Sequence, residues 1–228
     1  MEAASAWLER TLGLRLADPR LLDEALTHRS LGSRNNERLE YLGDAVLSFA
    51  VAALLFREFP DATEGELSRY RARLVSGESL GAAALELGLG DHLRLGEGEL
   101  KSGGYRRASI LADALEAVIG AIYLDSGIEA ARAAAERLLR PRLAALPPAD
   151  ALKDPKTRLQ KRLQAAGQPL PRYEVLEVSG EPHDQRFTVR CTAGEAGLAA
   201  EATGTSRRRA EQEAAGRLLA LTGEGDPT

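Results

Sequence analysis

Three acidic residues recur at helical spacing in one stretch of the chain. Glu37, Glu40 and Asp44 are three and four residues apart, so on a helix from Asn36 to Phe56 they share one face. Like charges at this spacing repel each other by about 0.2–0.5 kcal/mol per pair. A solvated acidic face is the simplest interpretation, and a cation held by the carboxylates is the alternative.

A second predicted helix repeats this arrangement. Asp113 and Glu116 are three residues apart and lie opposite an apolar stripe. That stripe comprises Leu111, Leu115, Val118 and Ile122. If the two helices pack side by side, four carboxylates converge, those of Glu40, Asp44, Asp113 and Glu116. Only a hard divalent cation would offset their repulsion, so we expect Mg²⁺, with Mn²⁺ as the second candidate.

The remaining composition favours phosphate chemistry at such a site. The chain has one cysteine and three histidines, which disfavours zinc or copper. Divalent cations clamp a phosphodiester and lower the pKa of a bound water, so hydrolysis needs no serine or histidine nucleophile. We therefore interpret Cys191 as a small strand residue and His28 as a residue that orders local structure.

The helix from Asn36 to Phe56 needs a core-facing side. We assign this side to the stripe Leu39, Leu42, Val46, Phe49, Ala53 and Phe56. The longest uncharged apolar run, Ala45 to Phe56, is too short to cross a bilayer and indicates a buried helix. The first residues do not resemble a signal peptide, so we expect a cytoplasmic protein with no membrane partner.

Periodicity and charge divide the 228 residues into two units. Residues 1–146 have a helical pattern, and prolines at 147, 148 and 155 indicate a short extended linker over 147–153. Residues 154–222 predict an α-β-β-β-α unit, and residues 223–228 a flexible tail. Residues 1–146 hold 18 basic and 22 acidic side chains, whereas residues 153–220 hold 12 and 9, which keeps a nucleic-acid partner open for the second unit.

The segment NERLEYLGDAVL, Asn36 to Leu47, closely resembles the signature of the ribonuclease III family. ALTHRS, EGELSRYRARLVS and KSGGYRRASILADALEAVIGAIYLDSG extend this similarity over the helical unit. The second unit resembles a double-stranded-RNA-binding domain through DPKTRLQ, GEPHDQRF and ATGTSRRRAEQEAA. Its departures are Ala202, where a turn glycine is usual, and Thr205, where a basic residue is common. We expect both to tune the loop before the last helix.

The resemblance implies a multidomain α and α+β protein, with an all-helical endonuclease domain before the α-β-β-β-α domain. It implies that Glu40, Asp44, Asp113 and Glu116 bind the metal, with Asp44 and Glu116 most important for catalysis. Glu37 and Glu64 would line the catalytic valley, and Tyr41 would lie at a homodimer interface or, as a second interpretation, in the core.

The activity implied is Mg²⁺-dependent hydrolysis of both strands of double-stranded RNA. The products would carry 5′-phosphates, 3′-hydroxyls and short 3′ overhangs, and the substrates would be ribosomal, messenger and transfer RNA precursors. A-form RNA is recognised mainly by shape, across its minor groove. The expected RNA contacts are Thr157, Gln160, Gln164, Pro182, His183, Ser206, Arg207, Arg208 and Arg209.

Two other functions remain open from the sequence. The first is a non-catalytic RNA-binding protein that keeps the fold without cleaving RNA. This interpretation would have to explain why four acids are retained although their clustering costs stability. A duplex-binding regulator for which cleavage is secondary is the third candidate.

Overall fold

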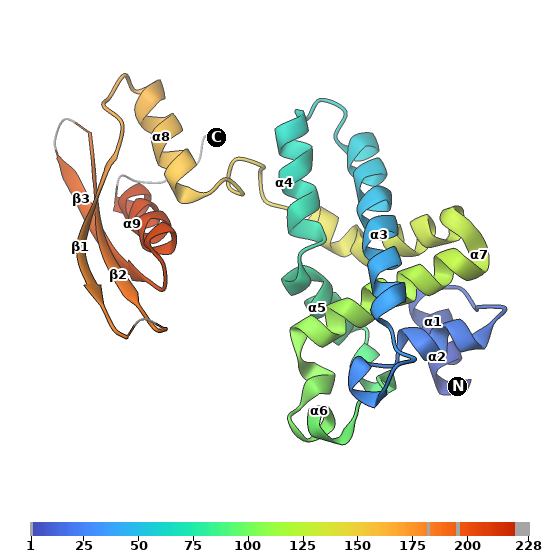
Figure 1. Cartoon of the computed structure of the whole chain (residues 1–228). Helices are drawn as coiled ribbons and strands as arrows, with labels where there is room; N and C mark the ends of the chain where they lie inside the picture. Colours follow the sequence, from blue (N-terminus) through green and yellow to red (C-terminus); the bar gives the residue numbers. More distant parts are fainter. Residues whose placement is uncertain (1, 182, 195–196, 222–228) are drawn as a thin grey trace. The chain divides into compact units, whose positions relative to one another are not determined.

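Two long helices form the centre of the first unit. Helix α3, Glu37–Glu58, crosses and packs against helix α7, Ala108–Ala144, as Figure 1 shows. The structure is a computed structural model that describes residues 2–181, 183–194 and 197–221. Helix α7 changes direction at Gly127, whose φ of 80° and ψ of −178° are not helical. A residue without Cβ adopts this conformation at little cost, so Gly127 allows the bend.

Shorter helices surround this pair. They are α1 (Glu2–Leu12), α2 (Pro19–Ala25), η1 (Arg29–Leu31), α4 (Glu64–Leu74), α5 (Gly77–Glu86), η2 (Leu89–His92), α6 (Glu97–Lys101) and η3 (Gly104–Arg106). Trp7 anchors α1 in the core, where it is 2% exposed and its indole N–H donates to the carbonyl oxygen of Leu87 at 2.7 Å. The predicted helical character of this unit is confirmed.

The two central helices differ in how well periodicity predicts their buried sides. All four residues of the α7 stripe are buried. On α3, Leu39 and Val46 are buried, but the assignment of Phe49, Ala53 and Phe56 to the core is wrong. Ala53 is exposed, and the rings of Phe49 and Phe56 are 57% and 75% exposed. The core side instead includes Gly43, Leu47, Ala50, Val51, Leu54 and Leu55. Because α3 is apolar on more than one side, periodicity alone does not identify its buried face.

Helix α3 is also long and apolar enough to span a membrane by length and composition. The core helix of a soluble protein passes the same test. Here the helix packs against α7 and carries Glu37, Glu40 and Asp44. We therefore describe it as a core helix.

The second unit contains a three-stranded antiparallel sheet in the order β1-β2-β3. Its elements are α8 (Pro155–Ala165), β1 (Arg172–Ser179), β2 (Arg186–Ala193), β3 (Leu198–Gly204) and α9 (Arg207–Leu221). Both helices cover one face of the sheet (Figure 1), where Leu159, Cys191 and Leu218 share one core. The predicted α-β-β-β-α order is confirmed, and Cys191 is the buried strand residue that we expected.

Two expectations about connecting segments need correction. Residues 148–153 do not form an extended connection, because the N–H groups of Ala151, Leu152 and Lys153 each donate to the carbonyl oxygen three residues earlier. A proline lacks an N–H but keeps its carbonyl acceptor, so Pro148 can start this compact turn. Ala202 is not in the loop before α9; it is buried in β3 opposite Val189.

Candidate active site

The first structural feature of the site is the close approach of two helix backbones. A Cβ atom on Gly43 of α3 would lie 1.8 Å from the carbonyl oxygen of Glu116, and one on Gly120 of α7 would lie 2.3 Å from the carbonyl oxygen of Leu39. No side chain fits at either position, so two glycines facing each other permit the contact. The contact places the acids of α3 beside those of α7.

Three carboxylates meet where the helices cross. Glu40, Asp113 and Glu116 are each partly buried, and each offers one carboxylate oxygen within 4.8 Å of the other two. Asp44 is exposed and is not a member of this trio, although its charge raises the pKa of both Glu40 and Glu116. The structure thus brings three of the four predicted metal ligands together and places the fourth next to them.

Burial and mutual repulsion both act on these groups. Burial, followed by the charges of Asp44, Asp113 and Glu40, raises the pKa of Glu116 to about 7. The pKa of Glu40 is also raised, mainly by burial and by Asp113. Burial raises the pKa of Asp113 as well, against the opposing charges of His28 and Arg29. Carboxylates with raised pKa values are stabilised most when a cation binds them, because the cation offsets the cost of the buried negative charge.

The donor set fits a hard divalent cation. All three close ligands are carboxylate oxygens, which Mg²⁺ and Mn²⁺ accept. His28 lines the neighbouring pocket, and its Nδ1 lies 2.9 Å from the hydroxyl oxygen of Ser30, so the ring orders the local segment as we expected. Cys191 lies in the other unit. Soft or nitrogen-preferring metals therefore have few of their usual ligands here.

A pocket of about 290 Å³ opens beside the trio. Glu37, Glu40 and Asp113 line it together with the basic side chains of Arg29 and Arg107. Glu37 is exposed and lies 3.7 Å from the Arg29 guanidinium. The pocket is therefore lined by acidic and basic side chains. The two arginines can offset the repulsion between the carboxylates of the pocket and a polyanion.

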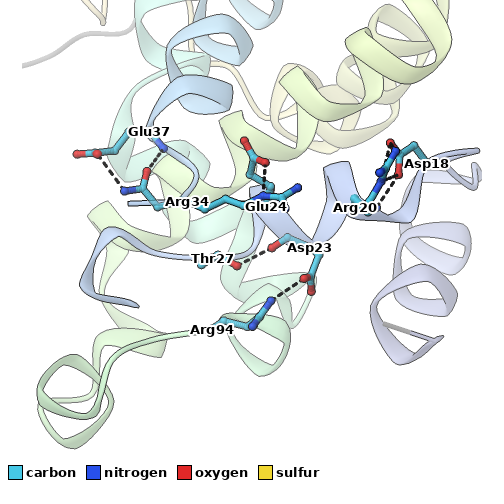
Figure 2. A network of polar contacts seen from close by, with 9 residues as sticks. Asp18, Arg20, Asp23, Glu24, Thr27, Arg34, Glu37 and Arg94 are labelled. Carbon is cyan, nitrogen blue, oxygen red and sulfur yellow. Dashed lines mark hydrogen bonds and ion pairs between the residues drawn. The ribbon is translucent and has the colours of Figure 1, made fainter. Parts of the chain in front are cut away.

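A polar network holds the segment that leads into α3, as Figure 2 shows. Arg94 pairs with Asp23 at 2.6 Å, and the Thr27 hydroxyl donates to the carbonyl oxygen of Asp23 at 2.6 Å. The carbonyl oxygen of Thr27 in turn accepts from the N–H of Asn36 at 2.8 Å. This chain of contacts fixes where α3 begins and therefore where Glu37 and Glu40 lie.

Two residues of this region were not identified from the sequence. Asn36 lines the pocket and is 2% exposed. Its side-chain nitrogen, Nδ2, has no hydrogen-bond partner among the described residues. Arg107 is held by Glu99 at 2.8 Å and Ser102 at 3.2 Å. Both lie within the quoted motifs, but each precedes its helix, so the spacing of residues along the helix does not indicate where these side chains lie.

Glu64 and Tyr41 are not members of the trio. Glu64 is exposed at the first position of α4, where its carboxylate accepts a hydrogen bond from Ser68 at 2.8 Å. Tyr41 is 83% exposed on α3, which contradicts the alternative placement in the core of its own chain. Catalytic and interface roles for these residues stay predictions.

The expected RNA-binding residues of the second unit lie at three places. Gln160 and Gln164 are exposed on α8, and the hydroxyl of Thr157 donates to Asp154 at 3.1 Å. His183 is exposed between β1 and β2, whereas Pro182 lies outside the described residues, as does the predicted tail 223–228. Ser206 caps α9 by accepting from the N–H of Arg209 at 3.2 Å. Arg207, Arg208 and Arg209 are exposed.

Comparisons with known proteins agree with this organisation. A family model described as Ribonuclease-III-like matches residues 18–143, and one described as Double-stranded RNA binding motif matches residues 155–221. Ribonuclease 3 of Alkalilimnicola ehrlichii is 58% identical over 212 residues, 93% of each chain. Ribonuclease 3 of Pseudomonas fluorescens is 54% identical over 223 residues, 98% of this chain and 97% of that one.

A solved structure of the nuclease domain of ribonuclease III from Campylobacter jejuni is similar to the helical unit. It is 47% identical, with a TM-score of 0.58, and the match covers 59% of this chain and 95% of that one. The fold and the acidic site thus define a metal-dependent nuclease that carries its own double-stranded-RNA-binding domain. The protein belongs to the ribonuclease III family and is a double-strand-specific endoribonuclease.

The glycine contact can be tested by adding one methyl group. Gly43→Ala forces α3 and α7 apart, because the new Cβ would meet backbone atoms that cannot rotate away. Overpacking of this kind costs about 1–3 kcal/mol or more. We expect the melting temperature of the nuclease domain to fall by roughly 2–12 °C in a thermal scan. Gly98→Ala is the control, since nothing lies within 4 Å of its new Cβ; equal melting temperatures for the two variants would contradict the steric argument.

The raised pKa of Glu116 predicts how stability changes with pH in a chelator. Because the folded-state pKa is about 7 and the usual value is 4.5, the ionised carboxylate destabilises the fold increasingly as pH rises through this interval. Glu116→Gln removes that cost. In EDTA we expect the variant to melt a few degrees above the wild type at pH 8, with a much smaller difference at pH 5. The same difference at both pH values would show that the ionised carboxylate is not the cause.

Proposed function

We propose that this chain is a Mg²⁺-dependent enzyme that hydrolyses both strands of double-stranded RNA, with Mn²⁺ as a substitute. Its products would carry 5′-phosphates and 3′-hydroxyls with short 3′ overhangs. The observation that supports this most directly is the trio Glu40, Asp113 and Glu116, whose oxygens lie within 4.8 Å of one another. Oxygen-only ligands and raised pKa values favour a hard cation over other ligands.

Each part of the site would have a distinct task. Glu40, Asp113 and Glu116 would hold the cation, and Asp44 would complete the set from the next turn of α3. A divalent cation supplies Lewis-acid polarisation of the phosphodiester and lowers the pKa of water. Arg29 would offset the repulsion between these acids and the RNA backbone from the same pocket. Glu37 and Glu64 are proposed to line the path of the strand.

We further propose that the enzyme is a homodimer. Tyr41, Phe49 and Phe56 project from α3 with exposed fractions of 83%, 57% and 75%. Large exposed rings on one helix are typical of a protein interface. The related Campylobacter jejuni nuclease domain is described as having a region involved in dimer formation. Two copies would provide two sites, one for each strand.

The second unit would hold the duplex in place for cleavage. We propose that Thr157, Gln160 and Gln164 contact one minor groove and that Pro182 and His183 contact the next. Ser206 and Arg207–Arg209 would bind phosphates at the beginning of α9, where the helix dipole favours anions. Suitable substrates in the cytoplasm would be ribosomal, messenger and transfer RNA precursors.

Cleavage of a long perfect RNA duplex tests the proposal. With Mg²⁺ we expect short duplex products with 5′-phosphates, and no cleavage of the same RNA as a single strand. Glu116→Gln should slow cleavage by about 10³-fold or more, since a bound metal supplies several kcal/mol of stabilisation. Duplex binding in EDTA should change little. Binding without cleavage by the wild type, under Mg²⁺ and Mn²⁺ alike, would favour a non-catalytic RNA-binding protein instead.

The oligomeric state tests the exposed aromatic face. Phe49→Glu places a charge in the centre of the proposed interface, so we expect a monomer in sedimentation experiments at micromolar concentration where the wild type is a dimer. Leu85→Glu on α5 is the matched control, because Leu85 is similarly exposed at 55% but lies on another helix. If both variants stay dimeric, the aromatic face of α3 is not the interface.

A further inference from the structure

A buried carboxylate joins the two helices of the second unit. Glu211 on α9 is 8% exposed, and its two oxygens bind two different cations. Oε2 accepts from the Lys156 ammonium at 2.6 Å, and Oε1 accepts from the Arg207 guanidinium at 2.9 Å. Lys156 belongs to α8 and Arg207 to α9, so one side chain connects the beginnings of both helices.

This arrangement keeps Glu211 charged. Burial alone would raise the pKa of Glu211, but the hydrogen bonds and positive charges of Lys156 and Arg207 together outweigh burial and lower it. A buried carboxylate with two charged donors has a fixed position, because both oxygens are engaged. The cations that it holds are fixed in turn.

Both cations keep an exposed side while they are held. The Lys156 side chain is 35% exposed and its ammonium also lies over the Tyr173 ring, 4.5 Å from the centroid. The Arg207 side chain is 65% exposed at the first residue of α9. A long lysine or arginine side chain normally loses rotamer entropy when it binds a phosphate. Here the carboxylate and the ring have already restricted that freedom.

We infer that Glu211 is a positioning residue that presents Lys156 and Arg207 as one preorganised pair to an RNA phosphate. Lys156 thereby becomes an RNA contact in addition to those expected from the sequence. The inference rests on the proposed function, in which Arg207 binds the duplex. A Glu211 that served only to join α8 to α9 would stabilise the domain without changing how it responds to salt.

The direction in which a charge-removing substitution changes RNA affinity distinguishes a positioning role of Glu211 from a purely structural one. Glu211→Gln removes a negative charge near a polyanion, so simple electrostatics predicts tighter binding. Loss of positioning predicts weaker binding despite the more favourable net charge. Glu213→Gln is the matched control: it removes the same charge from the same helix, at an exposed residue paired only with Arg217 among the interactions described, at 3.4 Å.

The experiment measures the affinity of the full-length protein for an RNA duplex in EDTA from 50 to 200 mM salt. For Glu211→Gln we expect roughly fivefold weaker binding and a shallower dependence on salt, with Glu213→Gln unchanged or tighter. Lys156→Met keeps contact with the Tyr173 ring and should lower the slope of log affinity against log salt by about one. In the Lys156→Met background, Glu211→Gln should have a smaller effect, because the two residues act together.

Cleavage kinetics and unfolding complete the test. Glu211→Gln should raise KM and leave kcat unchanged at saturating duplex, since Glu211 belongs to the second unit and the metal-binding carboxylates belong to the first. If a thermal scan shows that Glu211→Gln unfolds the domain, Lys156→Met carries the test alone. Equal or tighter binding by a folded Glu211→Gln, or an unchanged salt slope for Lys156→Met, would overturn the inference. Absence of duplex binding by the wild type would instead reject the proposed function.

Discussion

The close approach of α3 and α7 is the constraint on which the site depends. Carboxylates from two helices can share one cation only if the helix axes are near each other, and side chains at the crossing would prevent this. Gly43 and Gly120 remove the two side chains that would stand there. The adjacent turns then carry Glu40 on one helix and Asp113 and Glu116 on the other. The backbone contact between the helices therefore assembles the cluster, even though the acids repel one another.

The cost of this assembly is electrostatic. Burial of Glu116, followed by repulsion from Asp44, Asp113 and Glu40, raises its pKa to about 7. The surrounding apolar contacts of α3 and α7 must outweigh this repulsion until a cation arrives. In the second domain the charges are arranged differently, because each oxygen of Glu211 already has a cation. In the account proposed here, the first domain leaves negative charge for a metal and the second presents positive charge to a phosphate.

Much of this organisation follows from helical and strand periodicity. The α7 stripe, the spacing of the acids on each helix and the α-β-β-β-α order were predictable, because each depends on local spacing. The convergence of the acids depends also on the contact between α3 and α7, which spacing along one helix does not determine. The exposure of Phe49 and Phe56 was not, since an apolar residue has the same pattern whether it faces its own core or a partner. Asn36 and Glu211 were missed for another reason. Their surroundings come from residues distant in sequence, such as Thr27 and Lys156.

The central claim is that Glu40, Asp113 and Glu116 form one cation site at the helix crossing. Anomalous diffraction from crystals of the protein grown with Mn²⁺ tests it most directly, because the ion is located without reference to activity. The account predicts a strong peak within about 2–2.5 Å of an oxygen from each of the three carboxylates. A peak bound elsewhere, or none at this crossing under Mn²⁺ concentrations that support cleavage, would contradict it.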